Sequence, residues 1–287
     1  MSTNTIIDHR YRLGPRLGGG GMADVFEARD LRLRRQVAVK RCRSSQRDTA
    51  AQGLLAEAEL LAGLSHPGLL RLYDVGYEGR RPFLVLQFAA GGTLRDRLDC
   101  GRMTSARVAE IGAAIAGVLS YVHGRGIVHR DVKPDNILFD DQSECYLADF
   151  GIARTEDQAT PDLFGTAGYL APEQVGCGEV GPAADVYSLG LVLLECMTGQ
   201  VEYPGTGAEA AMARLAHPPK VPGTWGRPWR AVLTAMTATE PGRRPDAATC
   251  AATLRALADG GPMPISSEPR PRSWLVKLAA AACAATF

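Results

Sequence analysis

The stretch HRDVKPDNIL, residues 129–138, places charged and amide side chains at close spacing near the middle of the chain. Within it, Asp131 is followed by Lys133 and then by Asn136, and a second short segment with an acidic residue, ADFGIAR, follows at residues 148–154. Asp and Asn are common turn formers, so either segment alone would more often mark a turn than a catalytic site. The meaning of the two segments therefore depends on the sequence on either side of them.

The composition sets limits on the class of protein. At 287 residues, the chain is long enough for two average domains or for one fold of two lobes. Its formal net charge of +1 argues against bulk electrostatic attraction to nucleic acid. The seven cysteines are scattered without a C-x-x-C pair, which indicates reduced intracellular thiols, and the five histidines show no metal-binding spacing. The first residues contain no long apolar run, so we expect no signal peptide and a cytoplasmic protein.

The part of the chain before residue 90 is expected to be rich in β-strands. Short β-type runs separated by glycine or charged turns occur at Tyr11–Leu17, Val25–Asp30, Gln36–Lys40, Gly68–Tyr77 and Pro82–Phe88. In the third run, the strand period of two predicts Ala38 and Lys40 on one face and Val37 and Val39 on the other.

One helix is expected among these strands, over AAQGLLAEAELLAGL at residues 50–64. Glu57 falls on the apolar face that Leu54 and Leu61 define, whereas Glu59 should meet solvent. Taken alone, Glu57 is best interpreted as a half-exposed glutamate at the edge of the apolar stripe. A basic residue elsewhere that needs a partner would reverse this interpretation.

After AAGG at residues 89–92, the pattern becomes helical. An apolar stripe at helical spacing runs from Val108 to Val122, opened by Thr104 and closed by Gly124. Further helices are expected at Asp185–Met197, which is apolar nearly all round, and near Trp229–Ala238 and Asp246–Ala258.

A glycine-rich stretch, GGGGMADVF at residues 18–26, fits the phosphate-covering pattern G-x-G-x-x-G-x-V in part. Gly18, Gly20 and Val25 match, but Ala23 stands where the third glycine belongs. Alone, the motif is weak, and a loose turn between two strands is the alternative.

With these pieces in place, the sequence resembles the eukaryotic-like (Hanks-type) Ser/Thr protein kinases, particularly their bacterial branch, over roughly residues 11–258. The matching pieces occur in family order: LGGGGMADV, VAVK, Glu57 in its helix, HRDVKPDN, DFG, GTAGYLAPE, DVYSLG and EPGRRP. The resemblance implies an α+β, two-lobed kinase fold. Its β-rich N-lobe with one helix would span 11–89 and its mainly helical C-lobe 90–258, after an N-terminal extension at 1–10.

The resemblance also implies roles in phosphate transfer from ATP to protein substrates. Lys40 resembles the strand lysine that holds the α- and β-phosphates, and Glu57 would be its partner. The alternative for Lys40 is a lysine at a strand end whose side chain extends to water, and the resemblance argues against it. Asp131 resembles the catalytic aspartate that accepts or steers the proton of the substrate hydroxyl. Lys133 stands where Ser/Thr-specific kinases place a lysine that contacts the transferring phosphate. Asn136 resembles a ligand of the bound metal.

Together with Asn136, Asp149 would supply hard oxygen ligands for Mg²⁺ or Mn²⁺ shared with ATP. The resemblance makes the glycine-rich stretch a nucleotide-covering loop, with Gly18 and Gly20 close to phosphate. Residues implied around the adenine are Leu17, Val25 and Ala38 above it, Leu138 below it, backbone groups of Gln87 and Ala89 at its edge, and Leu86 at the back of the pocket. For each apolar member, ordinary core packing is the alternative.

Regulation is implied at the segment from Asp149 to Glu173. Arg130 resembles the arginine that pairs with a phosphorylated activation loop, and Thr160 or Thr155 is the candidate for autophosphorylation, with two solvated loop threonines as the alternative. Thr166 matches a threonine that contacts the catalytic aspartate and lysine. Two structural assignments follow from the resemblance: an ion pair between Glu173 and Arg244, and a buried Asp185 that hydrogen-bonds the catalytic-segment backbone.

The end of the chain is expected to be a Pro-rich, charged linker at 259–273 and an apolar tail at 274–287. The tail is short for a membrane span, and a truncated anchor, an interfacial segment and a helix packed on protein remain alternatives. A nucleotide-binding scaffold without catalysis and a small-molecule kinase are the competing functions. The presence of Lys40, Asp131, Asn136 and Asp149 argues against the first, and GTAGYLAPE, which resembles a platform for a polypeptide, argues against the second. A transient homodimer for trans-autophosphorylation is a further expected partner.

Overall fold

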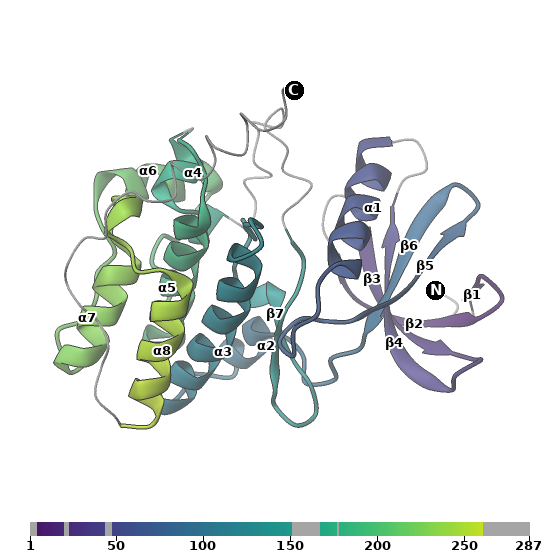
Figure 1. Cartoon of the computed structure of the whole chain (residues 1–287), viewed down its shortest axis with the longest axis horizontal. Helices are drawn as coiled ribbons and strands as arrows, with labels where there is room; N and C mark the ends of the chain where they lie inside the picture. The colour runs from purple at the N-terminus through teal and green to yellow at the C-terminus, as the bar shows by residue number, and fades with distance from the viewer. Residues whose placement is uncertain (1–4, 20–22, 44–47, 151–166, 177, 261–287) are drawn as a thin grey trace, which may run out of the picture.

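In the computed structural model, which describes residues 5–19, 23–43, 48–150, 167–176 and 178–260, an antiparallel sheet and a group of helices lie at opposite ends of the molecule (Figure 1). The strands of the sheet are β1 (Ile6–Ile7), β2 (Tyr11–Gly19), β3 (Ala23–Asp30), β4 (Arg35–Cys42), β5 (Leu72–Glu78) and β6 (Arg81–Gln87). They are ordered β1-β2-β3-β4-β6-β5, and every neighbouring pair is antiparallel. The expected α+β fold with a β-rich first lobe is confirmed.

The two faces of the sheet bury different partners, as the strand period predicts. Val37 and Val39 pack on one face of β4 with Tyr11 and Phe83. On the other face, Ala38 joins a cluster with residues of helix α1 (Asp48–Ala62), which lies between the sheet and the helical half (Figure 1). The alternation in β4 therefore turns Lys40 toward the same side as α1.

Helix α1 buries a carboxylate on its apolar face. Glu57 is only 6 % exposed, whereas Glu59 is exposed to solvent. Leu54 and Ala58 are buried on either side of Glu57 along the helix face. The interpretation of Glu57 as a half-exposed residue at the edge of the stripe is therefore wrong, and its position on the buried face is confirmed.

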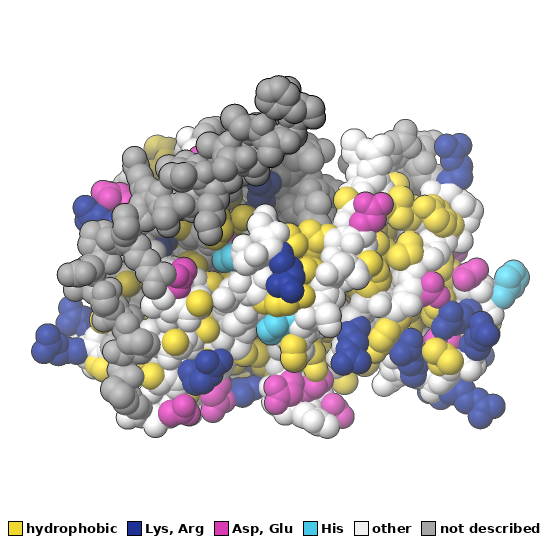
Figure 2. Space-filling view, in the orientation of Figure 1, with side chains coloured by type: hydrophobic (Ala, Val, Ile, Leu, Met, Phe, Trp, Pro, Cys, Tyr) yellow, Lys and Arg dark blue, Asp and Glu magenta, His cyan; other side chains and the backbone are white. Residues whose placement is uncertain are grey.

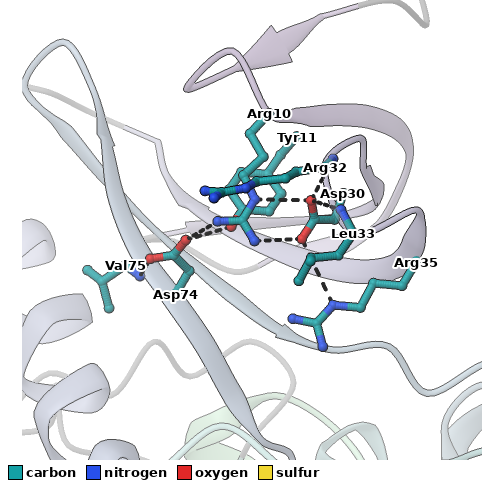
Figure 3. A network of polar contacts seen from close by, with 8 residues as sticks. All are labelled: Arg10, Tyr11, Asp30, Arg32, Leu33, Arg35, Asp74 and Val75. Carbon is teal, nitrogen blue, oxygen red and sulfur yellow. Dashed lines mark hydrogen bonds and ion pairs between the residues drawn. The ribbon is translucent and has the colours of Figure 1, made fainter.

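A polar network holds the outer end of the sheet (Figure 3). Arg10 donates to both oxygens of Asp30 at 3.0 and 2.7 Å and to Asp74 at 2.9 Å, and the Tyr11 hydroxyl donates to Asp74 at 2.6 Å. The Arg10 hydrogen bonds lower the pKa of Asp30 to about 2 against the effect of burial. The network thus joins β2, β3 and β5, and Figure 2 shows blue and magenta side chains close together at this end of the molecule.

The helical half begins after β6 and is built around three helices. Its helices are α2 (Leu94–Asp99), α3 (Ser105–His123), α4 (Pro172–Val175), α5 (Pro182–Thr198), α6 (Gly207–Ala216), α7 (Arg227–Met236) and α8 (Ala247–Ala258). Helices α3, α5 and α8 share one apolar core, and a Cβ at Gly112 of α3 would lie 2.9 Å from a methyl carbon of Leu193 in α5, so the helices pack closely here. A short hairpin of β7 (Ile137–Phe139) and β8 (Cys145–Leu147) follows α3 in the chain and packs on the same apolar core.

Helix α3 begins and ends where its caps predict. Thr104 is the N-cap, with its side chain accepting from the Arg107 backbone, and Gly124 is the C-cap. Among the described residues, α3 is the one helix long and apolar enough to cross a membrane. It is mostly buried inside the helical half, so these properties reflect its place in the core.

The strand expected at Gly68–Tyr77 begins later, at Leu72. The backbone at Gly68 instead packs on α3, where a Cβ would lie 2.5 Å from a Val118 methyl carbon. Gly68 also accepts a hydrogen bond from Leu147, and Leu69 forms a bridge with Leu147. Residues 68–70 therefore connect the sheet to the helical half rather than extending β5.

Candidate active site

A buried ion pair joins the sheet, α1 and the segment after β8. Lys40 Nζ in β4 lies 2.9 and 2.8 Å from the two carboxylate oxygens of Glu57 in α1. The same ammonium lies 2.8 Å from Oδ1 of Asp149. The structure thus brings together three residues that are up to 109 positions apart in the sequence and that were predicted to share a site.

The charges in this cluster are interdependent. Burial alone would lower the pKa of Lys40, but the two carboxylates outweigh it and raise that pKa, so the side chain is a cation at neutral pH. Burial raises the pKa of Glu57, whereas the charge of Lys40 lowers the pKa of Asp149 against burial. With both carboxylates ionised, the cluster carries one negative charge in excess.

The stretch at residues 129–138, called the catalytic segment below, gathers its polar side chains around Asp131. Lys133 Nζ lies 2.7 Å from Asp131 Oδ2, and Asn136 Nδ2 donates to the same oxygen at 2.9 Å and to the Asp131 carbonyl at 2.8 Å. The other carboxylate oxygen, Oδ1, is buried and has no hydrogen-bond partner in the part of the chain that the structure describes. A buried acceptor of this kind is costly unless a ligand uses it.

Asp185 of α5 fixes the backbone of this segment. It is 1 % exposed and accepts from the backbone N–H groups of His129 at 2.8 Å and Arg130 at 2.7 Å. The ring of His123 lies 2.7 Å from the same carboxylate. Arg130 has a φ of 67°, a left-handed conformation that costs a non-glycine residue about 1–3 kcal/mol and persists only when its surroundings impose it. The hydrogen bonds of Asp185 supply that constraint.

His129 connects the catalytic segment to Asp149. Its ring is buried, donates from Nε2 to the Ala148 carbonyl at 3.1 Å and packs on Phe150 with ring centroids 4.7 Å apart. Burial lowers the pKa of His129, so the ring is neutral at physiological pH. Asp149, between these two contacts, has a φ of 57°. The packing around His129 therefore sets the direction from which Asp149 meets Lys40.

The residues expected around an adenine ring lie on β2, β3, β4 and β6, just after β6, and on β7. Ala38 and Leu86 are buried and paired across β4 and β6, and the half-buried members are Val25, Gln87, Ala89 and Leu138. Leu17 is 52 % exposed near the end of β2. The backbone N–H of Gln87 donates to Arg71, so this group is already used within the chain.

Some of the other predicted residues are described by the structure, and the rest lie outside the described residues. Gly18 pairs with Val25 and has open space where a Cβ would point. Arg244 and Glu173 form the expected ion pair, at 2.6 and 2.8 Å, and Arg244 also donates to three backbone carbonyls. The predicted residues Gly20, Thr155, Thr160 and Thr166, the tail 274–287 and most of the linker 259–273 lie outside the described residues.

Sequence reasoning missed several polar residues beside the catalytic segment. Gln174 donates to the Arg130 carbonyl at 3.1 Å, and Arg95, Tyr169 and Glu195 form a hydrogen-bonded group nearby. Glu195 was a signal for this group, because it lies in a helix that is apolar nearly all round and a buried carboxylate needs a partner. The partner, Arg95, stands in a short helix whose sequence gave no periodic pattern.

The sequence of this chain is similar to a known protein family and to several known proteins. The family described as "Protein kinase domain" matches residues 11–253. The chain is 36 % identical over 283 residues to "Serine/threonine-protein kinase PknL" of Mycobacterium bovis, covering 94 % of this chain and 71 % of the relative. It is 41 % identical over 218 residues to "Serine/threonine-protein kinase PknB" of Mycobacterium tuberculosis, covering 71 % of this chain and 35 % of that protein. A "Probable serine/threonine-protein kinase SCO3848" of Streptomyces coelicolor is 38 % identical over 227 residues, which are 74 % of this chain and 34 % of that protein.

Proposed function

The chain belongs to the protein kinase family, and from that premise we propose how its residues divide the work of phosphate transfer. It is an ATP-dependent Ser/Thr protein kinase of the bacterial type, and its substrates are proteins. We assign residues 11–89 to the N-lobe and 90–258 to the C-lobe. Lys40, held by Glu57, is assigned to the α- and β-phosphates of ATP, and the adenine to the residues expected around it.

The assignment of Asp131 as the catalytic carboxylate is carried by its unpartnered buried oxygen. Oδ2 is held by Lys133 and Asn136, so the carboxylate cannot rotate without losing two bonds. Oδ1 remains as the acceptor for the hydroxyl of a substrate Ser or Thr. A carboxylate fixed at hydrogen-bond distance aligns the hydroxyl and takes its proton while the bond from the hydroxyl oxygen to the γ-phosphorus of ATP forms and the bond from that phosphorus to ADP breaks. We assign Lys133, which lies 2.7 Å from Asp131, the role of offsetting charge on the transferring phosphate.

The experiment that tests this assignment is phosphate transfer from labelled ATP to a generic basic protein. We expect the wild type to label Ser and Thr of the acceptor and the Asp131→Asn variant to leave them unlabelled. Equal labelling by both proteins would remove Asp131 from the reaction.

A divalent metal ion fits the donors that Asn136 and Asp149 offer. The hydrogen bonds of Asn136 to Asp131 both use Nδ2, which leaves its amide oxygen as a ligand, and Asp149 adds a carboxylate. Within the described ranges, no group of three or more His, Cys, Asp or Glu could hold a metal without help, so phosphate oxygens would complete the site. We propose Mg²⁺ or Mn²⁺, which would neutralise phosphate charge when bound.

Replacing Asp149 by Asn should weaken the binding of the metal ion. The side chain keeps its shape but loses the charge that attracts a divalent cation, so we expect the Mg²⁺ concentration for half-maximal activity to rise at least about tenfold. Asp140→Asn is the matched control, because that carboxylate bonds only within the β7–β8 hairpin and its connecting turn among the described contacts. An unchanged Mg²⁺ dependence in Asp149→Asn would contradict the proposed metal site.

We also propose that the chain phosphorylates its own activation segment at Thr160 or Thr155, and that a phosphate there meets Arg130. Incubation with ATP followed by mass spectrometry should find one of these threonines phosphorylated. The Thr160→Ala variant should gain less kinase activity from this incubation than the wild type. If the reaction occurs in trans through a transient homodimer, its initial rate should rise with the square of the protein concentration. Finding neither threonine modified would reject the proposal.

For location, we propose the cytoplasm. The cysteines among the described residues are free thiols, which suits a reducing compartment: Cys42, Cys100, Cys145, Cys196 and Cys250.

A further inference from the structure

An aspartate near the start of β3 binds two arginines from other segments of the sheet. Arg16 in β2 donates from Nε to Asp24 Oδ1 at 2.7 Å. Arg43, which directly follows β4, donates to the same oxygen from Nε at 3.0 Å and from Nη2 at 2.8 Å. One carboxylate therefore joins β2, β3 and the end of β4. The three side chains are called the Asp24 cluster below.

The Asp24 cluster is ionised and partly open to water. The exposed fractions of its side chains are 49 % for Arg16, 21 % for Asp24 and 40 % for Arg43. The hydrogen bonds from Arg43 are the main cause of the lowered pKa of Asp24, so the carboxylate is charged at neutral pH. Because water and ions reach both pairs, dissolved salt should weaken them.

The Asp24 cluster lies directly against the backbone of Gly19, the last residue of β2. Gly19 and Asp24 are partners across the β2–β3 ladder. A Cβ at Gly19 would lie 2.5 Å from Asp24 Oδ1, 2.7 Å from Arg16 Nη2 and 2.9 Å from the Ala23 carbonyl oxygen. The missing side chain at Gly19 thus makes room for the ion pair at the point where the glycine-rich stretch leaves β2.

The ladder between β3 and β4 relates the Asp24 cluster to Lys40. Val25, which follows Asp24, is the partner of Lys40 across this ladder. Val25 packs on the face of the sheet that α1 covers, and Lys40 meets Glu57 on the same face. Since side chains alternate along a strand, Asp24 and Arg43 lie on the opposite face. The cluster therefore connects from behind the strand that carries Lys40 and the strands on either side of the glycine-rich stretch.

We infer that Asp24 is a positioning residue for ATP, because its two ion pairs set Gly18 and Val25 in place relative to Lys40. The inference rests on the proposed function, which assigns Lys40 to the phosphates, and on the places expected for Gly18 at the phosphates and Val25 at the adenine. Asp24 is an anion on the face away from Lys40, so it is not itself a ligand for phosphate. It contributes by fixing these residues before ATP binds, which reduces the entropy lost on binding.

The test is Asp24→Asn, with Glu78→Gln as a matched control. Glu78 also accepts from an arginine of the sheet, Arg41 at 3.1 Å, but it stands at the end of the edge strand β5. In Asp24→Asn we expect the dissociation constant for ATP, measured by titration calorimetry at low salt, to rise about fivefold, a change that two exposed ion pairs can supply. The KM for ATP should rise equally, while kcat and the KM for a generic basic protein stay within about twofold of wild type. Glu78→Gln should leave all of these values unchanged.

Two further readouts separate positioning from the simple loss of a charge. Removing a negative charge near the phosphates would by itself strengthen ATP binding, so the expected weakening has the opposite sign. Since salt screens exposed pairs, the ratio of the dissociation constants of variant and wild type should fall from about five at about 0.02 M salt toward one at about 0.5 M. In a background that carries Arg16→Gln and Arg43→Gln, Asp24→Asn should no longer weaken ATP binding.

The outcomes distinguish the inference from the function on which it rests. The titration needs no phosphate transfer, so it does not depend on the role of Asp131. Failure of the wild type to bind ATP would reject the proposed function, and the inference with it. ATP binding by the wild type with equal or tighter binding by Asp24→Asn would reject the inference alone. A weakening that salt does not alter, or an equal weakening in Glu78→Gln, would also overturn the inference.

Discussion

The Asp131→Asn variant should lose about two to four orders of magnitude in kcat for protein phosphorylation, the range that a positioned acid or base contributes. The amide can turn its oxygen toward Lys133 and Asn136 and keep both of their hydrogen bonds. Its NH₂ group then occupies the position of Oδ1, where the substrate hydroxyl requires an acceptor. The fold and ATP binding should survive, because Asp131 is not assigned to the nucleotide.

Single-turnover phosphorylation, measured with ATP in excess, separates the chemical step from binding in this variant. The dissociation constant for ATP and the unfolding temperature, measured on the same preparations, are the controls. A kcat within about threefold of wild type, with both controls unchanged, would mean that Asp131 only structures the segment.

The Arg244→Met variant should lose about 3–5 kcal/mol in the free energy of unfolding, the usual cost of removing one member of a buried ion pair. The Arg244 side chain is fully covered, and Glu173, which would be left without its partner, is 9 % exposed. The backbone carbonyls of Ala183, Ala238 and Thr239 would lose a donor as well. For a domain of this size, the unfolding temperature should fall by at least about 6 °C.

The neighbouring Arg243→Met variant is the matched control for Arg244→Met. Arg243 pairs with Glu240 on the surface, with both side chains about 70 % exposed, and such pairs contribute at most about 1 kcal/mol. The unfolding temperature of Arg244→Met should therefore lie clearly below that of Arg243→Met. Removing both partners, as in Arg244→Met with Glu173→Met, should recover part of the loss because no buried charge remains unpaired. Equal unfolding temperatures for the two single variants would show that the buried pair does not brace the C-lobe.

Elements with a local signature could be predicted from the sequence. Helix α3 is an example, because its apolar spacing is sustained and its ends carry Thr104 and Gly124. The pairing of Lys40 with Glu57 came from the resemblance to the kinase family, whereas the residues alone placed Glu57 on the apolar helix face and favoured a half-exposed side chain there.

Features set by contacts between distant segments could not be predicted. The run at Gly68 has β-strand composition, but its backbone packs on α3, and the missing side chain is the reason. Helix α2 has six residues, four of them charged, so its sequence shows no apolar period and gives no hint that Arg95 reaches Glu195. The left-handed conformations of Arg130 and Asp149 are likewise imposed by the contacts of Asp185 and His129.

The most direct test of the central claim, that a site centred on Asp131 transfers phosphate to Ser and Thr hydroxyls, is to map the labelled residues. Wild type and Asp131→Asn would each be incubated with Mg²⁺, ATP labelled in the γ-phosphate and a generic basic protein, and the acceptor analysed by mass spectrometry. The account predicts phosphoserine and phosphothreonine with the wild type and at most traces with the variant. Equal phosphorylation by both proteins, or ATP hydrolysis by the wild type without any modified Ser or Thr, would contradict it.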